Sequence, residues 1–575
     1  MGYKFRSTLT IGLLYGMLFV LILAVDFFLP DDIYIFSPLM IAILSCIGIF
    51  FQYLISPLII GWIYRIEWVD YNRLEQNDPH IAQLIQNVCQ KYNFKLPKFG
   101  VIHGGTPNAF TYGWTRNSAR LVITDGILEL LNAEEQRAVV AHELGHIEHN
   151  DFIVMTFVSA IPVMFYTIFR LLTNSYRYRR FTSVKPSRGS SDDNKYAQYI
   201  MLIKIGLAIV SYIMYIVGYF LSLFISRLRE YYADEFSGRE TADPNSLATA
   251  LVKIAYGILQ EPEKGQKTFN DKNQYVKALG IFDKNSAKNL AYSATNGSGK
   301  IDNTLLARAC AWDLYQPWAK FAEITSTHPL PAKRIKQLSY MSFKEFKKPP
   351  KVDLSQAKVE FEKQMGKSAL DEFFGELLIY IMPKLIFWTW LIVGGILFIA
   401  NFDITTFSPL FNGYWSFMVF SLVLAGIFQL IQNAFKYKSG FKEHKIVDLI
   451  GTIKVSPIRP VPTITKGFVI GRGVPGLFWS EDVVVRDEKG IMFIDYDFGI
   501  GFINTLFGIF KAEKLKGKDV EITGWYRRNP SPYIQVHKIK LLDGSGKSFG
   551  NYKRAFWQFV GIFLIALGGI LWFLL

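Results

Sequence analysis

Residues 141–150 read AHELGHIEHN, and this short stretch carries most of the information about the fold and chemistry of the chain. His142 and His146 stand four residues apart, and Glu143 follows the first of them. The surrounding residues 131–151 predict a helix, because a capping-box pattern opens the segment and alanines and valines continue it. Residues four apart share one face of a helix, so the two imidazoles can reach the same metal ion.

Glu143 is rotated by about 100° from His142 around the helix axis. It cannot easily be a third ligand, but it can hold a metal-bound water and act as a general base. Two histidine ligands with such a glutamate are typical of zinc metallopeptidases of the zincin type. A chance match on an ordinary polar helix is the alternative, but the 575 residues include only eight histidines.

A zinc site also needs a third protein ligand and an open position for water. Residues 227–238, RLREYYADEFSG, offer Glu230 and Asp234, which are four apart and share a face of a predicted helix. Glu230 is the predicted ligand, and Asp234 is predicted to orient a ligating histidine. Taken alone, a surface helix with carboxylates is the simpler explanation of this segment.

The chain as a whole is rich in apolar residues, at 50%, with a net charge of +15. A helix needs about 20 apolar residues to cross a bilayer. Seven stretches come close to that length, at about 8–29, 36–63, 152–172, 205–225, 377–400, 415–435 and 555–575. We therefore expect a multi-pass protein of the cell membrane, held against an anionic inner leaflet and not bound to nucleic acid. Three scattered cysteines indicate a reducing compartment for the soluble parts.

The distribution of lysine and arginine predicts the orientation of the spans. Lys4 and Arg6 place the N-terminus inside, and two aspartates place the first loop outside. The second span then returns the chain to the cytoplasm before 141–150, so the active site is expected to face the cytoplasm. The basic loop 173–198 disagrees with this order, because alternation of the spans places it outside.

The predicted fold is a multi-pass α-helical membrane protein with an α+β zincin-type metallopeptidase domain and a small β-rich domain. The expected order is two transmembrane helices (1–63), the metallopeptidase domain with two more spans (64–345), a linker with two spans (346–440), the β-rich cytoplasmic domain (441–552) and a last span (555–575). Strands are predicted at 482–487, 491–497, 520–528 and 533–539. An OB-like barrel would accommodate them. The β-rich domain has no identified partner and contributes no predicted ligand, so we expect it to be dispensable for bond cleavage.

Four motifs in this order along the chain resemble the HtpX family of membrane zinc endopeptidases, which is related to the CAAX prenyl endopeptidases. They are PNAF (107–110), His142-Glu143-x-x-His146, Glu230-Tyr231-Tyr232-Ala233-Asp234 after two apolar spans, and STHPLPAKRI (326–335). The resemblance covers about residues 1–345, and the ordered set is far more specific than any one motif.

The resemblance implies a protease of protein quality control that cleaves membrane or misfolded proteins and holds one zinc ion per chain. Glu230 would be the third zinc ligand. Asn108 and Ala109 would lie beside the bound peptide backbone. His328 would polarise the scissile carbonyl or stabilise the oxyanion, with Arg334 nearby, although a turn before a helix explains the Thr-His-Pro stretch equally well.

Two other functions are open. The first is a membrane scaffold whose β-rich domain binds a partner and whose metal site is vestigial. The intact set of His142, Glu143, His146 and Glu230 argues against it. The second is CAAX-type processing of prenylated proteins, which is disfavoured by the presence of only two spans before the zinc helix and by Ile147 after the second histidine. The sequence therefore favours a zinc endopeptidase acting on proteins or peptides.

Overall fold

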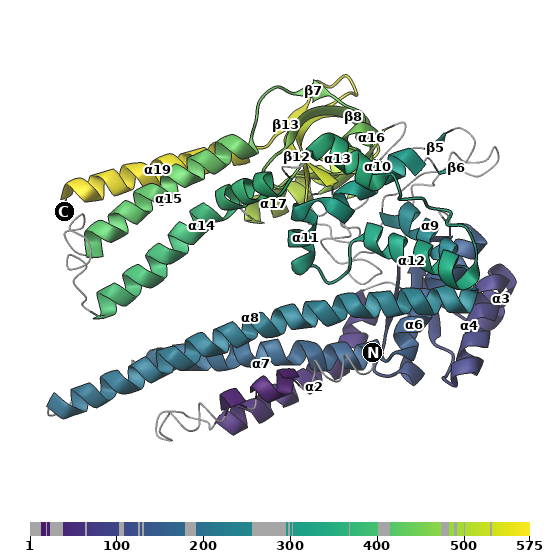
Figure 1. Ribbon diagram of the computed structural model, residues 1–575, viewed down its shortest axis with the longest axis horizontal. Coiled ribbons are helices and arrows are strands. Elements are labelled where there is room, and N and C mark those ends of the chain that lie inside the picture. Colours follow the sequence, from purple (N-terminus) through teal and green to yellow (C-terminus); the bar gives the residue numbers. More distant parts are fainter. Residues whose placement is uncertain are drawn as a thin grey trace.

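The computed structural model places two groups of long helices beside a helical domain with a small sheet and beside a β-barrel (Figure 1). The structure describes residues 13–18, 20–22, 38–63, 66–102, 108–124, 127–128, 131–178, 191–255, 295–296, 300–301, 303–366, 369–400, 414–472, 482–487, 491–499, 501–529 and 532–574. Nearly all residues with a predicted functional role lie within these ranges.

Five helices in the described part of the chain are long and apolar enough to cross a membrane. They are α7 (Asp151–Tyr178), α8 (Ser191–Thr241), α14 (Ala369–Ala400), α15 (Tyr414–Lys436) and α19 (Lys553–Leu574). These helices coincide with the last five of the seven predicted spans.

The first two predicted spans are described only in part. The span at 8–29 is helical at 13–18 and 20–22, and its other residues lie outside the described ranges. The second span falls on α2 (Pro38–Ile63), whose described apolar stretch, Ile47–Ile60, is shorter than a bilayer crossing. Both crossings stay predictions.

The loop predicted at 173–198 was wrong at both ends. α7 continues to Tyr178 and α8 already begins at Ser191, while residues 179–190 lie outside the described ranges. Hydropathy marks only the part of a helix that suits the bilayer core, but backbone hydrogen bonding allows the helix to continue into polar residues. The boundaries of a span therefore underestimate the length of its helix.

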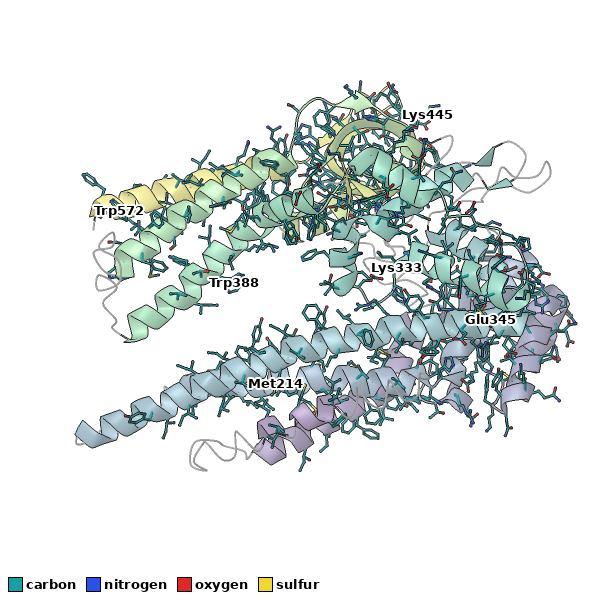
Figure 2. The ribbon with its side chains drawn as sticks, in the orientation of Figure 1. Met214, Lys333, Glu345, Trp388, Lys445 and Trp572 are labelled. Carbon is teal, nitrogen blue, oxygen red and sulfur yellow. The ribbon has the colours of Figure 1, made fainter. Side chains whose placement is uncertain are left out.

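The membrane helices form two groups. α7 packs along α8 and α2, with buried apolar side chains between them. α15 packs between α14 and α19, and Gly426 allows close approach because a Cβ there would stand 2.8 Å from the carbonyl oxygen of Gly561. Figure 2 shows Met214 of α8 and Trp388 of α14 on these separate groups.

A four-stranded sheet opens the domain that carries the predicted site. Its strands are β1 (Glu67–Val69), β2 (Lys98–Ile102), β3 (Ala109–Tyr112) and β4 (Arg120–Thr124), in the spatial order β1-β2-β4-β3. β2 and β4 are parallel, and the outer pairs are antiparallel. The strand predicted within ARLVITDG is β4, and β3 lies at an edge of the sheet.

Eight helices in the described part of the chain complete the domain. They are α3 (Tyr71–Asn77), α4 (Pro79–Tyr92), α6 (Ala133–Glu148), the end of α8, α9 (Pro244–Ala255), α10 (Asn303–Tyr315), α11 (Pro317–Ile324) and α12 (Pro331–Phe346). α6 packs against α4, α8, α9 and β3, and its side chains are buried nearly all round. The rotation of α6 about its axis is thereby fixed.

The predicted capping box is present at the start of α6. The backbone N–H of Glu135 donates to Asn132 Oδ1 at 2.9 Å, and the backbone N–H of Asn132 donates to Glu135 Oε2 at 3.0 Å. Lys253 of α9 forms a buried ion pair with Glu135 at 2.7 Å. These contacts anchor the first turn of the helix that carries the two predicted histidine ligands.

The C-terminal β region forms a small barrel, as predicted from its strands. Its strands are β7 (Lys442–Glu443), β8 (Val461–Arg472), β9 (Val483–Arg486), β10 (Ile491–Asp495), β11 (Asp519–Arg528), β12 (Pro532–Leu541) and β13 (Ser548–Gly550). The order β10-β9-β8-β11-β12 closes because β10 also pairs with β12, in parallel. Between β10 and β11 lie α17 (Gly501–Phe507), the π-helix η4 (Gly508–Ala512) and α18 (Glu513–Leu515).

The barrel shares its hydrophobic core with the protease helices. One cluster of buried side chains includes Trp312 and Trp318 of α10 and α11, Val455 before the barrel, and Tyr526 of β11. α13 (Ala357–Met365) and α16 (Ile446–Ile450) contribute to the same cluster. This continuity differs from the separate module that the sequence led us to expect.

Candidate metal centre

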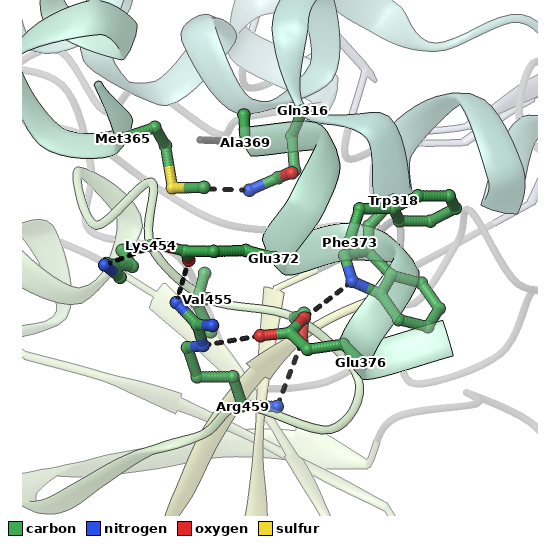
Figure 3. Close-up of a pocket in the computed structure, with 11 residues that line it drawn as sticks. Gln316, Trp318, Met365, Ala369, Glu372, Phe373, Glu376, Lys454, Val455 and Arg459 are labelled. Atoms are coloured by element: carbon green, nitrogen blue, oxygen red, sulfur yellow. Dashed lines mark hydrogen bonds and ion pairs between the residues drawn. The ribbon is translucent and has the colours of Figure 1, made fainter. Parts of the chain in front are cut away.

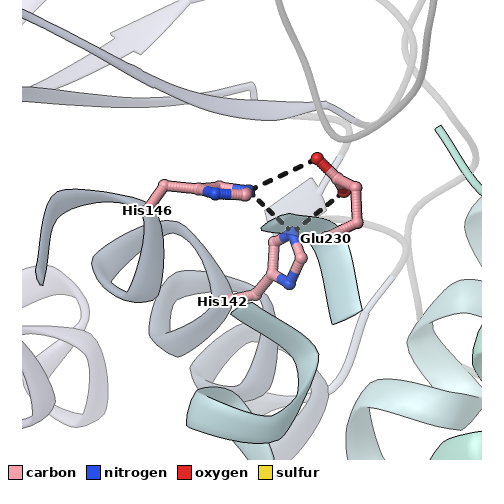
Figure 4. Close-up of side chains that lie close together, drawn as sticks. All are labelled: His142, His146 and Glu230. Atoms are coloured by element: carbon pink, nitrogen blue, oxygen red, sulfur yellow. Dashed lines mark hydrogen bonds and ion pairs between the residues drawn. The ribbon is translucent and has the colours of Figure 1, made fainter. Parts of the chain in front are cut away.

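The crossing of α6 and α8 brings the predicted ligands together. His142 and His146 point from α6, and Glu230 points from α8 (Figure 4). Gly145 permits the crossing, because a Cβ there would meet Ala233 Cα and Phe236 Cβ, both at 3.2 Å. The glycine weakens the helix intrinsically but allows the two backbones to lie close together.

Three ligand atoms from these residues lie within 4.8 Å of one another. The two Nε2 atoms of His142 and His146 are 3.2 Å apart. Each Nε2 lies 3.6 Å from an oxygen of Glu230. Donor atoms about 2.0–2.1 Å from a tetrahedral ion lie roughly 3.3 Å from each other, so these separations suit a shared metal ion.

The environment of Glu230 supports the same reading. Its side chain is fully buried, yet neither carboxylate oxygen forms a hydrogen bond with the described residues. A buried carboxylate without hydrogen bonds is costly, and metal coordination is one of the few arrangements that compensates for it. The residues present therefore fit a bound metal ion.

Each histidine is oriented by a second carboxylate. Nδ1 of His142 lies 3.0 Å from Asp234 Oδ1, and Nδ1 of His146 lies 2.5 Å from Asp151 Oδ2. Such contacts fix the ring so that its other nitrogen faces the metal position. Asp234 thus lies within hydrogen-bond distance of His142, and its orienting role stays a prediction. Asp151, the first residue of α7, was missed, although it lies only three positions after the end of α6.

Arg334 of α12 joins this carboxylate network. Its Nε donates to Asp234 Oδ2 at 2.9 Å, its Nη2 donates to Oδ1 at 2.5 Å, and its Nη1 lies 3.4 Å from Glu230 Oε2. Burial lowers the pKa of Arg334, but the attraction of Asp234 raises it by a larger amount. The pKa therefore lies above its usual value, and the guanidinium stays charged. The side chain is fully buried against these carboxylates, and its predicted contact with substrate stays a prediction.

The same carboxylates change the protonation of His142. Burial lowers the pKa of His142, while the neighbouring carboxylates of Asp234 and Glu230 raise it more, to about 9. Without a metal, the ring therefore holds a proton at neutral pH. A metal ion that binds at Nε2 has to displace this proton.

Glu143 lies beside the three ligands but on a different part of the helix surface. It is buried, and Thr111 of β3 donates a hydrogen bond from Oγ1 to Glu143 Oε2 at 3.1 Å. Glu143 is not part of the cluster formed by His142, His146 and Glu230, and its role as the general base stays a prediction. Thr111 was missed, because nothing in the sequence connects that strand with α6.

His328 approaches the site from the loop before α12. Its Nδ1 lies 3.2 Å from Glu230 Oε2. Ser326 shapes this loop, since its Oγ donates to the carbonyl of His328 at 2.8 Å and accepts from the backbone N–H of His328 at 3.2 Å. The predicted His328 is thus brought to the metal centre from a position 98 residues after Glu230.

Asn108 and Ala109 lie at the start of the edge strand β3. The backbone N–H of Asn108 donates to Thr124 Oγ1 at 2.9 Å, and Ala109 pairs with Ile123 of β4. Pro107 of the PNAF motif lies outside the described residues. The strand that bears Thr111 therefore also bears the two residues predicted to lie beside the substrate.

Comparison with known proteins agrees with this geometry. The family model "Peptidase family M48" matches residues 75–342. The Protease HtpX homolog of Methanothermobacter thermautotrophicus is 35% identical over 251 residues, which cover 44% of this chain and 85% of that protein. The Protease HtpX homolog of Aeropyrum pernix is 27% identical over 313 residues, or 53% of this chain and 86% of that protein.

One solved structure, Ste24p of S. mikatae, is similar at 21% identity over 58% of this chain and 64% of its own, with a TM-score of 0.31 that is too low to support a structural argument. Residues after 342, which include the barrel, lie outside the family match. The ordered motifs, the buried His-His-Glu cluster and the relatives agree, and the chain belongs to peptidase family M48, as an HtpX-like membrane metallopeptidase.

Proposed function

We propose that this protein is a zinc endopeptidase that hydrolyses membrane or misfolded proteins at the cytoplasmic face of the cell membrane. The observation that carries the proposal is the cluster of His142, His146 and Glu230, in which a fully buried carboxylate lacks hydrogen bonds. Two imidazoles and one carboxylate form a donor set typical of catalytic zinc sites. One zinc ion per chain would be held by these three residues.

The chemistry divides between the ion and Glu143. Zinc, when bound, polarises the scissile carbonyl and lowers the pKa of a water molecule. Glu143 accepts the proton of the attacking water and passes it to the leaving nitrogen. The hydrogen bond from Thr111 holds the glutamate in place and connects it to β3.

The substrate is proposed to bind along the edge of β3. An extended peptide can add a strand to an open sheet edge through main-chain hydrogen bonds. Asn108 and Ala109 would lie beside that peptide, and Thr111 already contacts the general base. His328 is placed to stabilise charge on the scissile carbonyl oxygen, while Arg334 would act through Asp234 and Glu230.

Proximity to the bilayer supports membrane proteins as substrates. α8 runs from its apolar stretch into the site without a break, so Glu230 lies on the same helix as the span. Phe224, an exposed apolar residue of α8, lies six positions before Glu230. At 1.5 Å per residue, this is a rise of about 9 Å along the helix axis. A segment at the membrane surface would need little displacement to reach the metal centre.

The cytoplasmic orientation is supported by the barrel. Its flanking helices end and begin with basic residues, Lys436 and Lys438 on one side and Lys553 and Arg554 on the other. Basic residues next to spans favour the cytoplasm. The barrel and the protease domain share one core, so both would lie on that side. A cysteine at the exposed Ser545 should then resist an impermeant thiol reagent in intact cells.

An OB-like topology is proposed for the barrel. With β8 to β12 numbered from one to five, the closed order is 1-2-3-5-4-1, and the third and fifth strands are parallel. Helices α17 and α18 lie between the third and fourth strands. This five-stranded closed arrangement is what an OB-fold would have. The metallopeptidase domain is likewise proposed to be of the zincin type.

Metal analysis combined with a cleavage assay tests the proposed function. The full-length protein in detergent should bind one zinc ion and cleave casein, and the Glu143→Gln variant should keep the metal and lose cleavage. Unchanged cleavage in Glu143→Gln would overturn the assignment of the base. A fully zinc-loaded wild type that cleaves no unfolded protein would overturn the endopeptidase proposal.

A further inference from the structure

The short helix α11 connects the C-terminal half of the molecule with the loop that carries His328. It has eight residues, begins after Gln316, and leads through Thr325 into the Ser326–His328 turn. Contacts at its start come from α14 and the barrel connector, and contacts at its end come from α8. This helix therefore lies between two parts of the chain that are far apart in sequence.

The start of α11 is held by buried polar contacts (Figure 3). The indole N–H of Trp318 donates to Glu376 Oε2 at 2.7 Å. Arg459, which precedes the barrel, lies 2.5 Å from Glu376 Oε1 through its Nε and also pairs with Glu372. The side chain of Gln316 donates to the carbonyl of Ile453 at 3.3 Å. The N-terminal part of α14 and the connector 453–459 thus both contact the start of α11.

A small, partly open pocket adjoins Trp318, Glu376 and Arg459. The indole ring of Trp318 also packs edge-on against Phe373 and Tyr380 of α14, with ring centroids 5.2 Å and 5.6 Å away. The start of α11 is therefore positioned by the polar contacts of Trp318 and Glu376 together with this aromatic packing.

The end of α11 is tied to α8 close to the metal centre. One nitrogen of Arg227, Nη1, lies 2.9 Å from the carbonyl oxygen of Glu323, 3.3 Å from that of Ile324 and 2.7 Å from that of Ser326. Arg227 is three residues before Glu230 on the same helix. A displacement of α11 would move the Ser326–His328 turn relative to Glu230.

We propose that Trp318, Glu376 and Arg459 are positioning residues for the proteolytic reaction. They fix the start of α11, and α11 holds His328 at 3.2 Å from Glu230. Glu376 and Arg459 lie beyond the residues matched by the family model, so this chain uses its C-terminal extension to complete its active site. The inference rests on the proposed role of His328.

Variants of Glu376 in the full-length protein test the proposal. Glu376→Gln keeps an acceptor for Trp318 but loses the charge that pairs with Arg459, whereas Glu376→Leu loses both. We expect a graded loss of kcat, mild for Gln and about 10- to 100-fold for Leu, the range of residues that support ligands indirectly. KM and bound metal should be nearly unchanged. Trp318→Phe, which keeps an aromatic side chain but removes the indole N–H donor, should behave like Glu376→Leu.

Glu443→Gln is the matched control. Its ion pair with Lys466, at 3.0 Å, lies on the exposed edge of the barrel, and its loss should leave kcat unaltered. If Glu376→Leu does not fold, Trp318→Phe, a smaller change, decides the question. A folded, metal-loaded Trp318→Phe variant with wild-type kcat would overturn the proposal.

A double-variant experiment separates positioning from general stabilisation. If Glu376 acts through His328, Glu376→Leu should lower kcat little further in a His328→Ala background, with cleavage followed for hours to measure the residual rate. Full additivity of the two effects would overturn the proposal. Failure of the proposed function itself is distinguishable, because the wild type and Glu143→Gln would then be equally inactive.

Discussion

The metal centre and the junction with the barrel both bury carboxylates, but only one of them leaves a carboxylate without hydrogen bonds. At the junction, Asp313 pairs with Arg528 at 2.9 Å, and Glu376 accepts from Trp318 while it pairs with Arg459. At the metal centre, the oxygens of Glu230 form no hydrogen bonds within the described part of the chain. The comparison indicates that a buried carboxylate with hydrogen bonds can join parts of a fold, while one without them can mark a place for a ligand.

The two regions also differ in how their charges are compensated. Arg528 lies over the ring of Trp312, 4.8 Å from its centroid, and donates to the carbonyl of Ala309. The metal centre instead combines two carboxylates, Asp234 and Asp151, that hold the histidines in one orientation. Changes at the metal centre are therefore expected to affect catalysis, and changes at the junction are expected to affect stability.

The largest expected effect is at Glu143. Glu143→Ala should lower kcat by about 10²- to 10⁴-fold, because general-base catalysis contributes in that range. Bound metal should stay near one equivalent, since Glu143 lies outside the ligand cluster. His142→Ala should instead lose the metal, because it removes a ligand. Elemental analysis beside a casein assay checks both, and equal metal loss in the two variants would contradict the division of roles.

At the junction, Arg528→Met should destabilise the protein by about 3–5 kcal/mol, the usual cost of leaving one partner of a buried ion pair alone. Both Arg528 and Asp313 are almost fully buried. Thermal unfolding in detergent measures the change. Lys518→Met, which removes the exposed pair with Asp543, is the control and should leave stability nearly unchanged.

The double variant Asp313→Leu with Arg528→Met sharpens this prediction. Replacement of both partners by apolar groups removes the uncompensated charge and should recover much of the lost stability. If Arg528→Met were as stable as the wild type, the barrel would be a loosely attached module. That outcome would restore the independence that the sequence predicted for residues 441–552.

The sequence predicted the metal centre far better than the junction. His142, Glu143 and His146 follow from helix geometry within one short segment, because spacing along a helix fixes which side chains meet. Glu230 and Asp234 were candidates from their spacing on a predicted helix, and resemblance to a family with the same ordered motifs supported them, whereas His328 came from the resemblance alone. The contacts of Asp151 and Thr111 escaped prediction because each depends on how neighbouring elements cross α6.

The junction left no comparable pattern in the sequence. Arg527 and Arg528 read as surface or core residues of a strand, yet Arg528 pairs with Asp313, 215 positions earlier. Such a contact depends on the docking of the barrel, which no local periodicity encodes. Strand prediction succeeded where alternation was strong, as in β11 and β12, and missed β8, in which a proline and two glycines interrupt the pattern.

A smaller effect is expected at the carboxylates that orient the histidines. Asp151→Ala should weaken metal affinity or activity by about 10- to 100-fold, the usual range for such partners. Asp234→Ala should reach at least the same range, because it also leaves the buried Arg334 without its main partner. Competition with a metal-binding dye gives the affinities. An Asp151→Ala protein with wild-type affinity would show that His146 needs no orienting partner.

The most gradual effect, about tenfold per pH unit, concerns the dependence of metal affinity on pH. In the metal-free protein, burial lowers the pKa of His142, but the neighbouring carboxylates of Asp234 and Glu230 outweigh burial and raise the pKa from 6.5 to about 9. The proton on His142 therefore stabilises the metal-free fold fully below pH 6.5, and this contribution disappears as the pH rises through about 9. A metal ion has to displace that proton, so apparent affinity should rise about tenfold per unit up to about pH 9 and then level off. Titrations with zinc in two buffers of different ionisation enthalpy would measure the released proton directly. Affinity that does not change between pH 7 and 9 would mean that His142 is already neutral in the metal-free site, and that its carboxylate neighbours orient the ring without holding a proton on it.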